Sequence, residues 1–368
     1  MRSPFYEKLD EHLIALGGLF NAHLHLDRAG TFDDRYFQGT NHSVEKEFYL
    51  SLHEKHHLIR SIHNGPAYDA FDLEGRINNY VDQMVACGTR RLDTLIDTTA
   101  DRVGLDALEI ALSIKASRAH QIDMRVAAYS PLGFRDDEPE RWSVLKEGAE
   151  KADFISALPE SDDHEEYPEH IGFMEHCRRF LELSIELDKP LHVHTDQRNQ
   201  PTECGTERLI EAVRQYGSAP LDKDGPSVWA VHMISPSTYD EARFESFVEG
   251  LLETNIGVIC CPSAAIGMRQ IRPILTPTYN SIPRLLELAA AGVPIRLASD
   301  NIADICSPST TADLRDEVFI LSAALRFYDV EILASFAAGK ILSEAQKEQI
   351  RHHLEENEFQ LRKAYESV

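Results

Sequence analysis

Eight short apolar runs predict a closed barrel of alternating strands and helices, the α/β architecture known as the (β/α)8 or TIM barrel. The runs are separated by longer amphipathic segments, and this alternation indicates parallel strands joined by crossover helices. Such a barrel absorbs about 250 residues or more in one domain, so the 368 residues fit one domain with helical additions. The expected strands are residues 17–24, 91–97, 124–130, 153–158, 190–195, 227–233, 256–262 and 293–299.

The segments between these runs have a helical pattern. In stretches such as LDALEIALSIKASRA and TERLIEAVRQYG, apolar residues recur three and four positions apart. About 65 residues separate the first two runs, too many for one crossover helix, and they predict extra helices near the barrel mouth. Helical patterns also continue after the last run. We therefore expect a single domain over residues 1–368, with a barrel core at about 17–340 and a C-terminal helix at about 343–366.

Composition limits the classes of function. The chain is 43% hydrophobic and 27% charged, which predicts a folded protein with a large core. Its 37 Lys and Arg against 61 Asp and Glu give a net charge of −24, which disfavours nucleic acid and anionic membranes as partners. No apolar run approaches the ~18 residues of a membrane span, and the N-terminus has no secretory pattern, so the expected location is the cytoplasm. Six scattered cysteines predict reduced thiols.

Metal-binding side chains recur where the expected strands end. His23 and His25 are two residues apart in NAHLHLDR, so both side chains face the barrel interior. His194 ends the fifth run, His232 ends the sixth and Asp300 follows the eighth. Barrel enzymes have their active sites at this end of the strands. The pattern predicts one metal site, because neutral imidazoles and a carboxylate suit Zn²⁺, or Fe²⁺ as the alternative.

Other polar residues have simpler interpretations. His192 shares a strand face with His194 but lies about 6.6 Å deeper, since each residue rises ~3.3 Å, and we expect it in the core. His53 and His57 share a helical face that we expect to be solvated rather than a second metal site. Glu160 belongs to the charged segment LPESDDHEE, where a solvated loop and a contact with substrate both remain open.

The ordered set of motifs H-x-H, H-x-D, H and S-D-N resembles the amidohydrolase superfamily, and more narrowly its cytosine deaminase-like branch. The similarity runs from about residue 18 to about residue 340 and includes NAHLHLDR, LHVHTDQ, AVHMIS and PIRLASDNIADICSP. It implies that His23, His25, His194 and Asp300 bind one divalent transition metal. It also implies that Asp300 takes a proton from the metal-bound water, and that His232 stabilises the oxygen that becomes negative on attack.

Several positions depart from that branch. Cytosine deaminases have H-x-D-E where this chain has His194-Thr195-Asp196-Gln197, and a glutamine does not transfer a proton as a carboxylic acid does. Pro131 lies near the expected position of a ring-binding glutamine, and SAAI replaces a stretch that usually contains asparagine. We therefore expect a substrate other than cytosine, in contact with Glu160, Asp196, Gln197 and Pro131. The N-terminal β-sandwich domain of many relatives is expected to be missing.

Two hypotheses follow for function. The first is a metal-dependent amidohydrolase or deaminase that cleaves a C–N bond of a small cyclic, N-substituted heterocyclic or amide substrate by attack of metal-bound hydroxide, with His232, Asp300 and Gln197 as catalytic residues. The second is a catalytically impaired protein of the same fold that binds a metal or ligand, in which Gln197 records lost proton transfer. The sequence leaves open whether the chain forms a homo-oligomer.

Overall fold

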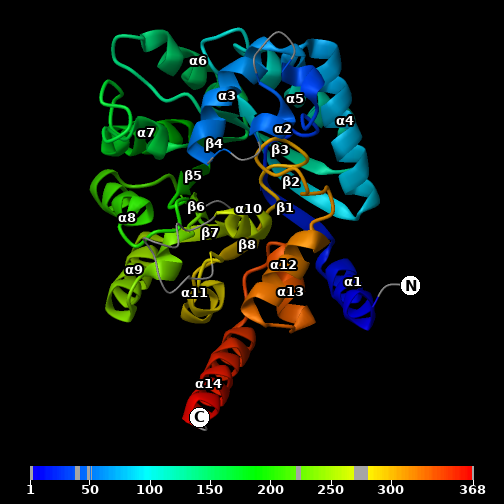
Figure 1. Ribbon diagram of the computed structural model, residues 1–368, viewed down its shortest axis with the longest axis vertical. Helices are drawn as coiled ribbons and strands as arrows, with labels where there is room; N and C mark the ends of the chain where they lie inside the picture. The colour runs from blue at the N-terminus through cyan, green and yellow to red at the C-terminus, as the bar shows by residue number, and fades with distance from the viewer. Residues whose placement is uncertain are drawn as a thin grey trace.

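A computed structural model describes residues 3–37, 42–47, 50, 52–220, 225–268 and 281–366. It confirms the barrel: eight parallel strands follow one another in the order β1 to β8 (Figure 1). All eight expected strands are present, each within two residues of its expected start and end. They are β1 Leu19–Leu24, β2 Thr89–Asp97, β3 Asp123–Tyr129, β4 Phe154–Ala157, β5 Leu191–Thr195, β6 Val228–His232, β7 Ile256–Cys260 and β8 Ile295–Leu297.

The strands could be recognised in the sequence as apolar runs because they are buried on both faces. Every residue of β1 and of β4 to β8 is buried, as is typical of a parallel sheet covered by helices. The connecting helices are α5 Asp106–Arg118, α6 Pro139–Lys151, α7 Phe173–Leu187, α8 Gly205–Tyr216, α9 Glu241–Thr254, α10 Pro262–Gly267 and α11 Leu285–Ala291, with the short 3-10 helices η3 Pro159–Asp162 and η4 Ser235–Thr238.

Helices are added at the places that the sequence indicates. Between β1 and β2 lie η1 Asp34–Phe37, α2 Val44–Glu47, α3 Leu52–Asn64, η2 Pro66–Tyr68 and α4 Ala70–Ala86. The other additions are α1 Pro4–Leu16, α12 Arg315–Leu325, α13 Val330–Ala337 and α14 Glu344–Glu366. The last of these confirms the expected C-terminal helix and points away from the barrel (Figure 1). None of the helices in the described ranges has the length and apolar character needed to cross a bilayer.

Strand β1 meets the end of β8 through residues of the expected metal site. The Asp300 amide donates to the His23 carbonyl at 3.0 Å, and the His25 amide donates to the Asp300 carbonyl at 3.1 Å. The Asn21 amide group donates to the Ser299 hydroxyl at 2.7 Å and accepts from the Ser299 amide at 3.1 Å. The same hydrogen bonds that close the barrel therefore hold Asp300 beside His23 and His25.

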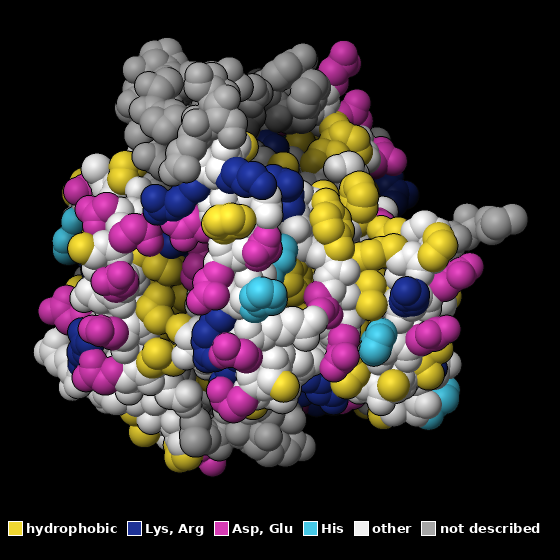
Figure 2. Space-filling model, turned by 90° about the horizontal axis from the view of Figure 1, so that it is seen from below, with side chains coloured by type: hydrophobic (Ala, Val, Ile, Leu, Met, Phe, Trp, Pro, Cys, Tyr) yellow, Lys and Arg dark blue, Asp and Glu magenta, His cyan; other side chains and the backbone are white. Residues whose placement is uncertain are grey.

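The surface bears charges of both signs. On the face drawn in Figure 2, Lys and Arg side chains are interspersed with Asp and Glu side chains. Ion pairs such as Lys146–Glu186 lie on the outer helices, and pairs this exposed contribute only about 0 to 1 kcal/mol each to stability. Fold stability therefore rests mainly on the buried barrel.

Candidate active site

Three imidazoles meet inside the mouth of the barrel. His23 and His25 come from β1 and His194 from β5, and one ring nitrogen of each lies within 4.8 Å of those of the other two. The Nε2 atoms of His23 and His194 are 3.1 Å apart. All three side chains are buried, with at most 3% of the residue exposed. The structure therefore confirms that the ends of these strands converge.

Hydrogen bonds and burial prepare these imidazoles to bind a metal. The Nδ1 atom of His194 donates to the Ala157 carbonyl at 3.0 Å, which leaves the lone pair of Nε2 directed at His23. Burial, with the neighbouring histidines, holds the pKa of His23 and of His194 below the ordinary value, so both rings are neutral. Neutral imidazoles are the form that binds Zn²⁺ or Fe²⁺, so the donor set fits the expected metal.

Asp300 completes the donor set. Its Oδ1 atom lies 3.4 Å from Nε2 of His25 and 4.0 Å from Nε2 of His23. Burial opposes ionisation of this carboxyl, but His232, His25 and His194 outweigh that effect and hold its pKa below the ordinary value. Asp300 is therefore a carboxylate at neutral pH, available both to bind a cation and to accept a proton.

The backbone is strained where the strands end. Asp196, His232 and Asp300 have φ angles of 58°, 73° and 59°, in the left-handed region that non-glycine residues rarely occupy. Strain of this kind costs about 1 to 3 kcal/mol per residue and clusters at functional sites. Here it accompanies the turns that aim His232 and Asp300 at the centre of the barrel.

A cavity of about 610 Å³ opens above the histidines. His25, His194, His232 and Asp300 line it, together with Glu160 and Gln197. His23 is fully buried beneath this surface. The Nδ1 atom of His232 is a buried polar atom that has no hydrogen-bond partner among the described residues. A cavity of this size with a few convergent polar groups is typical of a small-molecule site.

The four expected substrate contacts separate into two groups. Glu160 and Gln197 line the cavity and contact each other: Nε2 of Gln197 donates to Oε2 of Glu160 at 2.9 Å. The Asp196 carboxylate instead accepts hydrogen bonds from the amides of Gly205 and Thr206, at 2.6 and 2.8 Å, and so fixes the start of α8. Pro131 is buried and, like Asp196, is not among the described residues that line the cavity.

The remaining histidines occupy simpler positions. His192 is buried in the core, as expected, with its Nδ1 atom 3.5 Å from Nδ1 of His23 and its ring against Phe154. His53 and His57 belong to α3, but their side chains lie outside the described part of the chain.

Sequence analysis missed several residues that line the cavity, among them Tyr129, Arg28 and Lys55. Tyr129 ends β3, and its ring centroid lies 5.3 Å from that of His25 and 5.2 Å from that of His194. Arg28, whose guanidinium contacts Nδ1 of His25, follows the H-x-H motif directly and could have been noted there. Lys55 comes from α3, one of the added helices expected near the barrel mouth, but the sequence does not indicate which side chain of this helix reaches the cavity.

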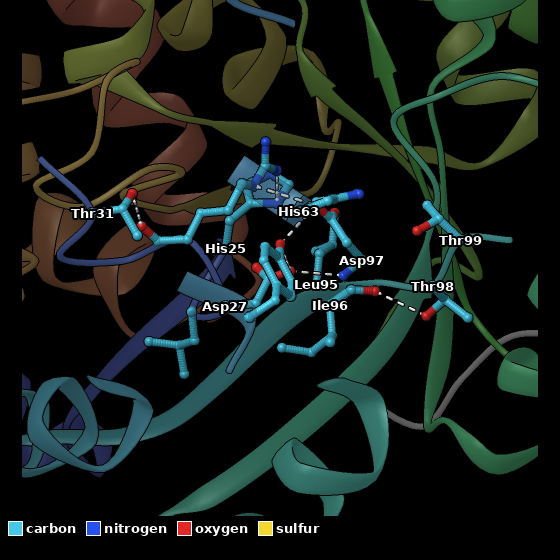
Figure 3. Close-up of polar contacts among 12 residues, drawn as sticks. His25, Asp27, Thr31, His63, Leu95, Ile96, Asp97, Thr98 and Thr99 are labelled. Carbon is cyan, nitrogen blue, oxygen red and sulfur yellow. Dashed lines mark hydrogen bonds and ion pairs between the residues drawn. The ribbon is translucent and has the colours of Figure 1, made fainter. Parts of the chain in front are cut away.

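A buried ionic network joins the added helix α3 to the barrel. His63, the penultimate residue of α3, lies with Nε2 3.0 Å from Asp97 and with Nδ1 2.6 Å from Asp101. The Tyr68 hydroxyl lies 2.8 Å from Asp27 and 2.9 Å from Asp97. Figure 3 shows Asp27 and Asp97 beside His63, close to His25. The network thus fixes the helix that carries Lys55 relative to β1, the strand that carries His23 and His25.

Stability should depend on the charge of His63. Burial alone lowers its pKa, but the hydrogen bonds to Asp101 and Asp97 prevail and raise the pKa from 6.5 to about 9. A raised pKa stabilises the fold fully below pH 6.5, and this contribution is lost as the pH rises through about 9. We expect His63→Ala to lower stability by at most about 3 to 5 kcal/mol near pH 6, since it removes the cation between Asp97 and Asp101 and leaves Arg28 as the cation beside the buried Asp97.

The measurement is the thermal unfolding midpoint of wild type and His63→Ala between pH 6 and 10, with the exposed His120→Ala as control. The difference in unfolding midpoint between wild type and His63→Ala should become smaller as the pH rises over this range. The midpoint of the control should stay close to that of wild type at every pH. A difference in midpoint that does not depend on pH would show that His63 stabilises the fold by packing alone.

Comparisons with known proteins agree with this architecture, although no family model matches the chain. An uncharacterized protein of Haemophilus influenzae is 26% identical over 285 residues, which are 76% of this chain and 92% of that protein. A pterin deaminase of Rhizobium rhizogenes is 21% identical over 240 residues, 64% of this chain. The chain spans about half of that deaminase, 51% of its length.

Two solved structures share the fold over most of the chain. The 5-methylcytosine deaminase of Klebsiella pneumoniae, liganded with phosphonocytosine, superimposes with a TM-score of 0.73 and 20% identity, covering 87% of this chain and 73% of that one. The N-isopropylammelide isopropylaminohydrolase of Burkholderia multivorans gives a TM-score of 0.65 and 17% identity, with coverage of 88% and 73%. At these identities the comparison establishes the fold, and the barrel fold implied by the resemblance to the amidohydrolase superfamily is confirmed.

Proposed function

We propose that this protein is a metal-dependent hydrolase that removes an amino or alkylamino group from a small nitrogen heterocycle by cleaving a C–N bond. The observation that carries the proposal is the convergence of His23, His25, His194 and Asp300 beneath a cavity that also presents His232. Structural neighbours named as deaminases and as an isopropylaminohydrolase support this kind of reaction.

The metal would be held by His23, His25, His194 and Asp300. When bound, a divalent ion, Zn²⁺ first and Fe²⁺ as the alternative, supplies Lewis acidity and lowers the pKa of a water from about 16 to about 7. Asp300 is a carboxylate at the end of β8, so it accepts the proton of the attacking water and passes it to the departing amine.

His232 has a separate role in this scheme. Burial lowers its pKa, so the ring is neutral and one of its nitrogens carries a hydrogen. Its place on the cavity wall lets it donate a hydrogen bond to the oxygen that becomes negative as water attacks. Preorganised donors of this kind are worth about 10² to 10³ in rate.

The amide of Gln197 orients the substrate in this scheme. Its NH₂ group donates to Glu160, so its carbonyl oxygen is free to accept a hydrogen bond from an N–H of the substrate. The Tyr129 ring covers His25 and His194 and limits the access of bulk water. These contacts suit a planar, polar ring of the size that a cavity of about 610 Å³ admits.

The test is release of ammonia or alkylamine by metal-loaded protein from a panel of pyrimidines, purines, pterins, triazines and lactams. We expect turnover of at least one ring and little or none of cytosine. Tight binding of panel members without turnover would overturn the proposal in favour of the alternative, a metal-binding or ligand-binding protein that has lost catalysis. Release of ammonia from cytosine at an efficient rate would show that a glutamate at position 197 is dispensable.

In the same assay, Gln197→Glu should not create a cytosine deaminase. The new carboxyl would stand where the amide now donates to Glu160 at 2.9 Å, so two carboxyl groups would compete for one proton. The SAAI stretch, whose Ser263 and Ala264 line the cavity, also differs from the branch. Each unpaired polar group on a misfitting substrate costs about 1 to 3 kcal/mol. We expect less than about a tenfold gain on cytosine. A gain of several hundredfold would identify position 197 as the sole obstacle.

A further inference from the structure

Glu160 is an ionisable side chain at the cavity that is neither one of the four expected metal ligands nor, among the described residues, a member of an ion pair with a cation. It lies in η3, directly after β4, and lines the same cavity as His194 and Gln197. Its Oε1 atom accepts from the Asp196 amide at 2.8 Å, and its Oε2 atom accepts from Gln197 at 2.9 Å. Both contacts come from the turn after β5, so the carboxyl group is held from one side and faces the cavity on the other.

The fixed carboxyl group keeps the capacity to carry a proton. Each of its oxygens has two lone-pair directions and uses one for the hydrogen bond from the turn after β5. The protonated form is a donor toward the cavity, and the ionised form is an acceptor there. Gln197, by contrast, is an amide with a fixed set of two donors and one acceptor oxygen.

Burial, together with the nearby Asp196, raises the pKa of Glu160 to about 7, although the hydrogen bond from Gln197 and the charge of Arg198 oppose this shift. Glu203 also faces this group from the turn after β5, and Glu166 lines the cavity on the same side. A carboxyl group with this pKa is present in both forms at neutral pH, which is the condition for efficient general acid–base catalysis.

Building on the function proposed above, we propose that Glu160 is the catalytic residue that moves the proton at the ring nitrogen of the substrate, a task that Gln197 cannot perform. Water adds its oxygen to the ring carbon, and the Glu160 carboxyl gives its proton to the adjacent ring nitrogen. The C–N bond to the amine then breaks and the carbonyl forms. Of the two water protons, Asp300 passes one to the amine, and the other restores the Glu160 carboxyl, so the products are the ring lactam and ammonia or an alkylamine.

The test compares wild type with Glu160→Gln, which keeps the shape of the side chain but removes its titratable proton. We expect kcat to fall about 10²- to 10⁴-fold, with KM changed by less than about tenfold and with the metal content unchanged. Because the proton donor must be protonated, the wild-type rate should fall as the pH rises above about 7, and this limb should vanish in the variant. Asp163→Asn is the matched control, since Asp163 ends the same segment but pairs with Arg208 at 2.7 Å outside the cavity.

A second measurement does not depend on turnover. The infrared difference spectrum between pH 5 and pH 9 should contain a protonated carboxyl signal that titrates near 7, and this signal should be smaller in Glu160→Gln by the contribution of one carboxyl group. The pKa of the buried Glu317 is also raised to about 7, so its signal should remain in both proteins. If wild type is active and Glu160→Gln has a kcat close to that of wild type, the role assigned to Glu160 is overturned and the proposed function is left intact. Wild type that turns over no member of the panel would instead overturn the proposed function, and the role of Glu160 with it.

Discussion

His25→Ala is expected to reduce the metal content from about one ion per chain to nearly none, and to abolish hydrolysis. The variant removes the imidazole whose Nε2 atom lies 3.4 Å from Asp300 and leaves two histidines and one carboxylate. Loss of a partner that merely supports a metal ligand costs about 10- to 100-fold in metal affinity, and loss of a ligand itself should cost more.

Elemental analysis of protein loaded with Zn²⁺ or Fe²⁺ and then freed of unbound ion measures the effect. The exposed His120→Ala serves as control, because it removes a histidine far from the expected ligands in sequence and on the surface. Circular dichroism of both variants checks that the barrel has folded. An unchanged metal content in His25→Ala would show that these residues are not the metal site.

The barrel could be predicted from the sequence because its strands are buried on both faces. A buried parallel strand is a continuous apolar run, and each such run stood out from amphipathic helices on either side. The one notable difference is β8, which comprises only Ile295–Leu297 of the expected residues 293–299. The chain leaves strand geometry there because Asp300, with φ of 59°, turns to bond with β1.

The positions of the metal-binding candidates could also be predicted, since strand ends meet at one rim of a barrel. The residues that form the wall of the cavity could not be predicted. Tyr129 and Lys55 reach it through packing between segments that are far apart in the sequence, and no local pattern reports such packing. For the same reason, no sequence pattern indicated that Asp196 would bind the first turn of α8 while its neighbour Gln197 would face the cavity.

The buried network around His63 shows a further limit of sequence reasoning. A histidine on a helix next to polar residues usually belongs to a solvated face, yet His63 is fully buried between Asp97 and Asp101. The signal that could have found it is the position of Asp97 at the end of β2, on the same rim as the histidines proposed to bind a metal. A carboxylate buried at that rim requires a partner, and the added helix provides it.

Asp300→Asn is expected to lower kcat by about 10²- to 10⁴-fold while KM changes little. The amide has nearly the same shape as the carboxylate, and its oxygen occupies a similar place beside His25 and His23. It cannot, however, accept and return a proton near neutral pH. Because general-base assistance acts mainly in the transition state, its loss should affect turnover more than substrate affinity.

Metal content must be measured on the same preparation, since Asp300 is also expected to bind the ion. Rates are therefore expressed per bound metal, which separates loss of the ion from loss of proton transfer. The comparison with Glu160→Gln is informative because the two variants should differ in metal content. Glu160→Gln should retain all of its metal, whereas Asp300→Asn should retain only part of it. If Asp300→Asn retained near wild-type turnover per metal, the residue that deprotonates the attacking water would have to lie elsewhere, and the cavity offers Glu160 as the next candidate.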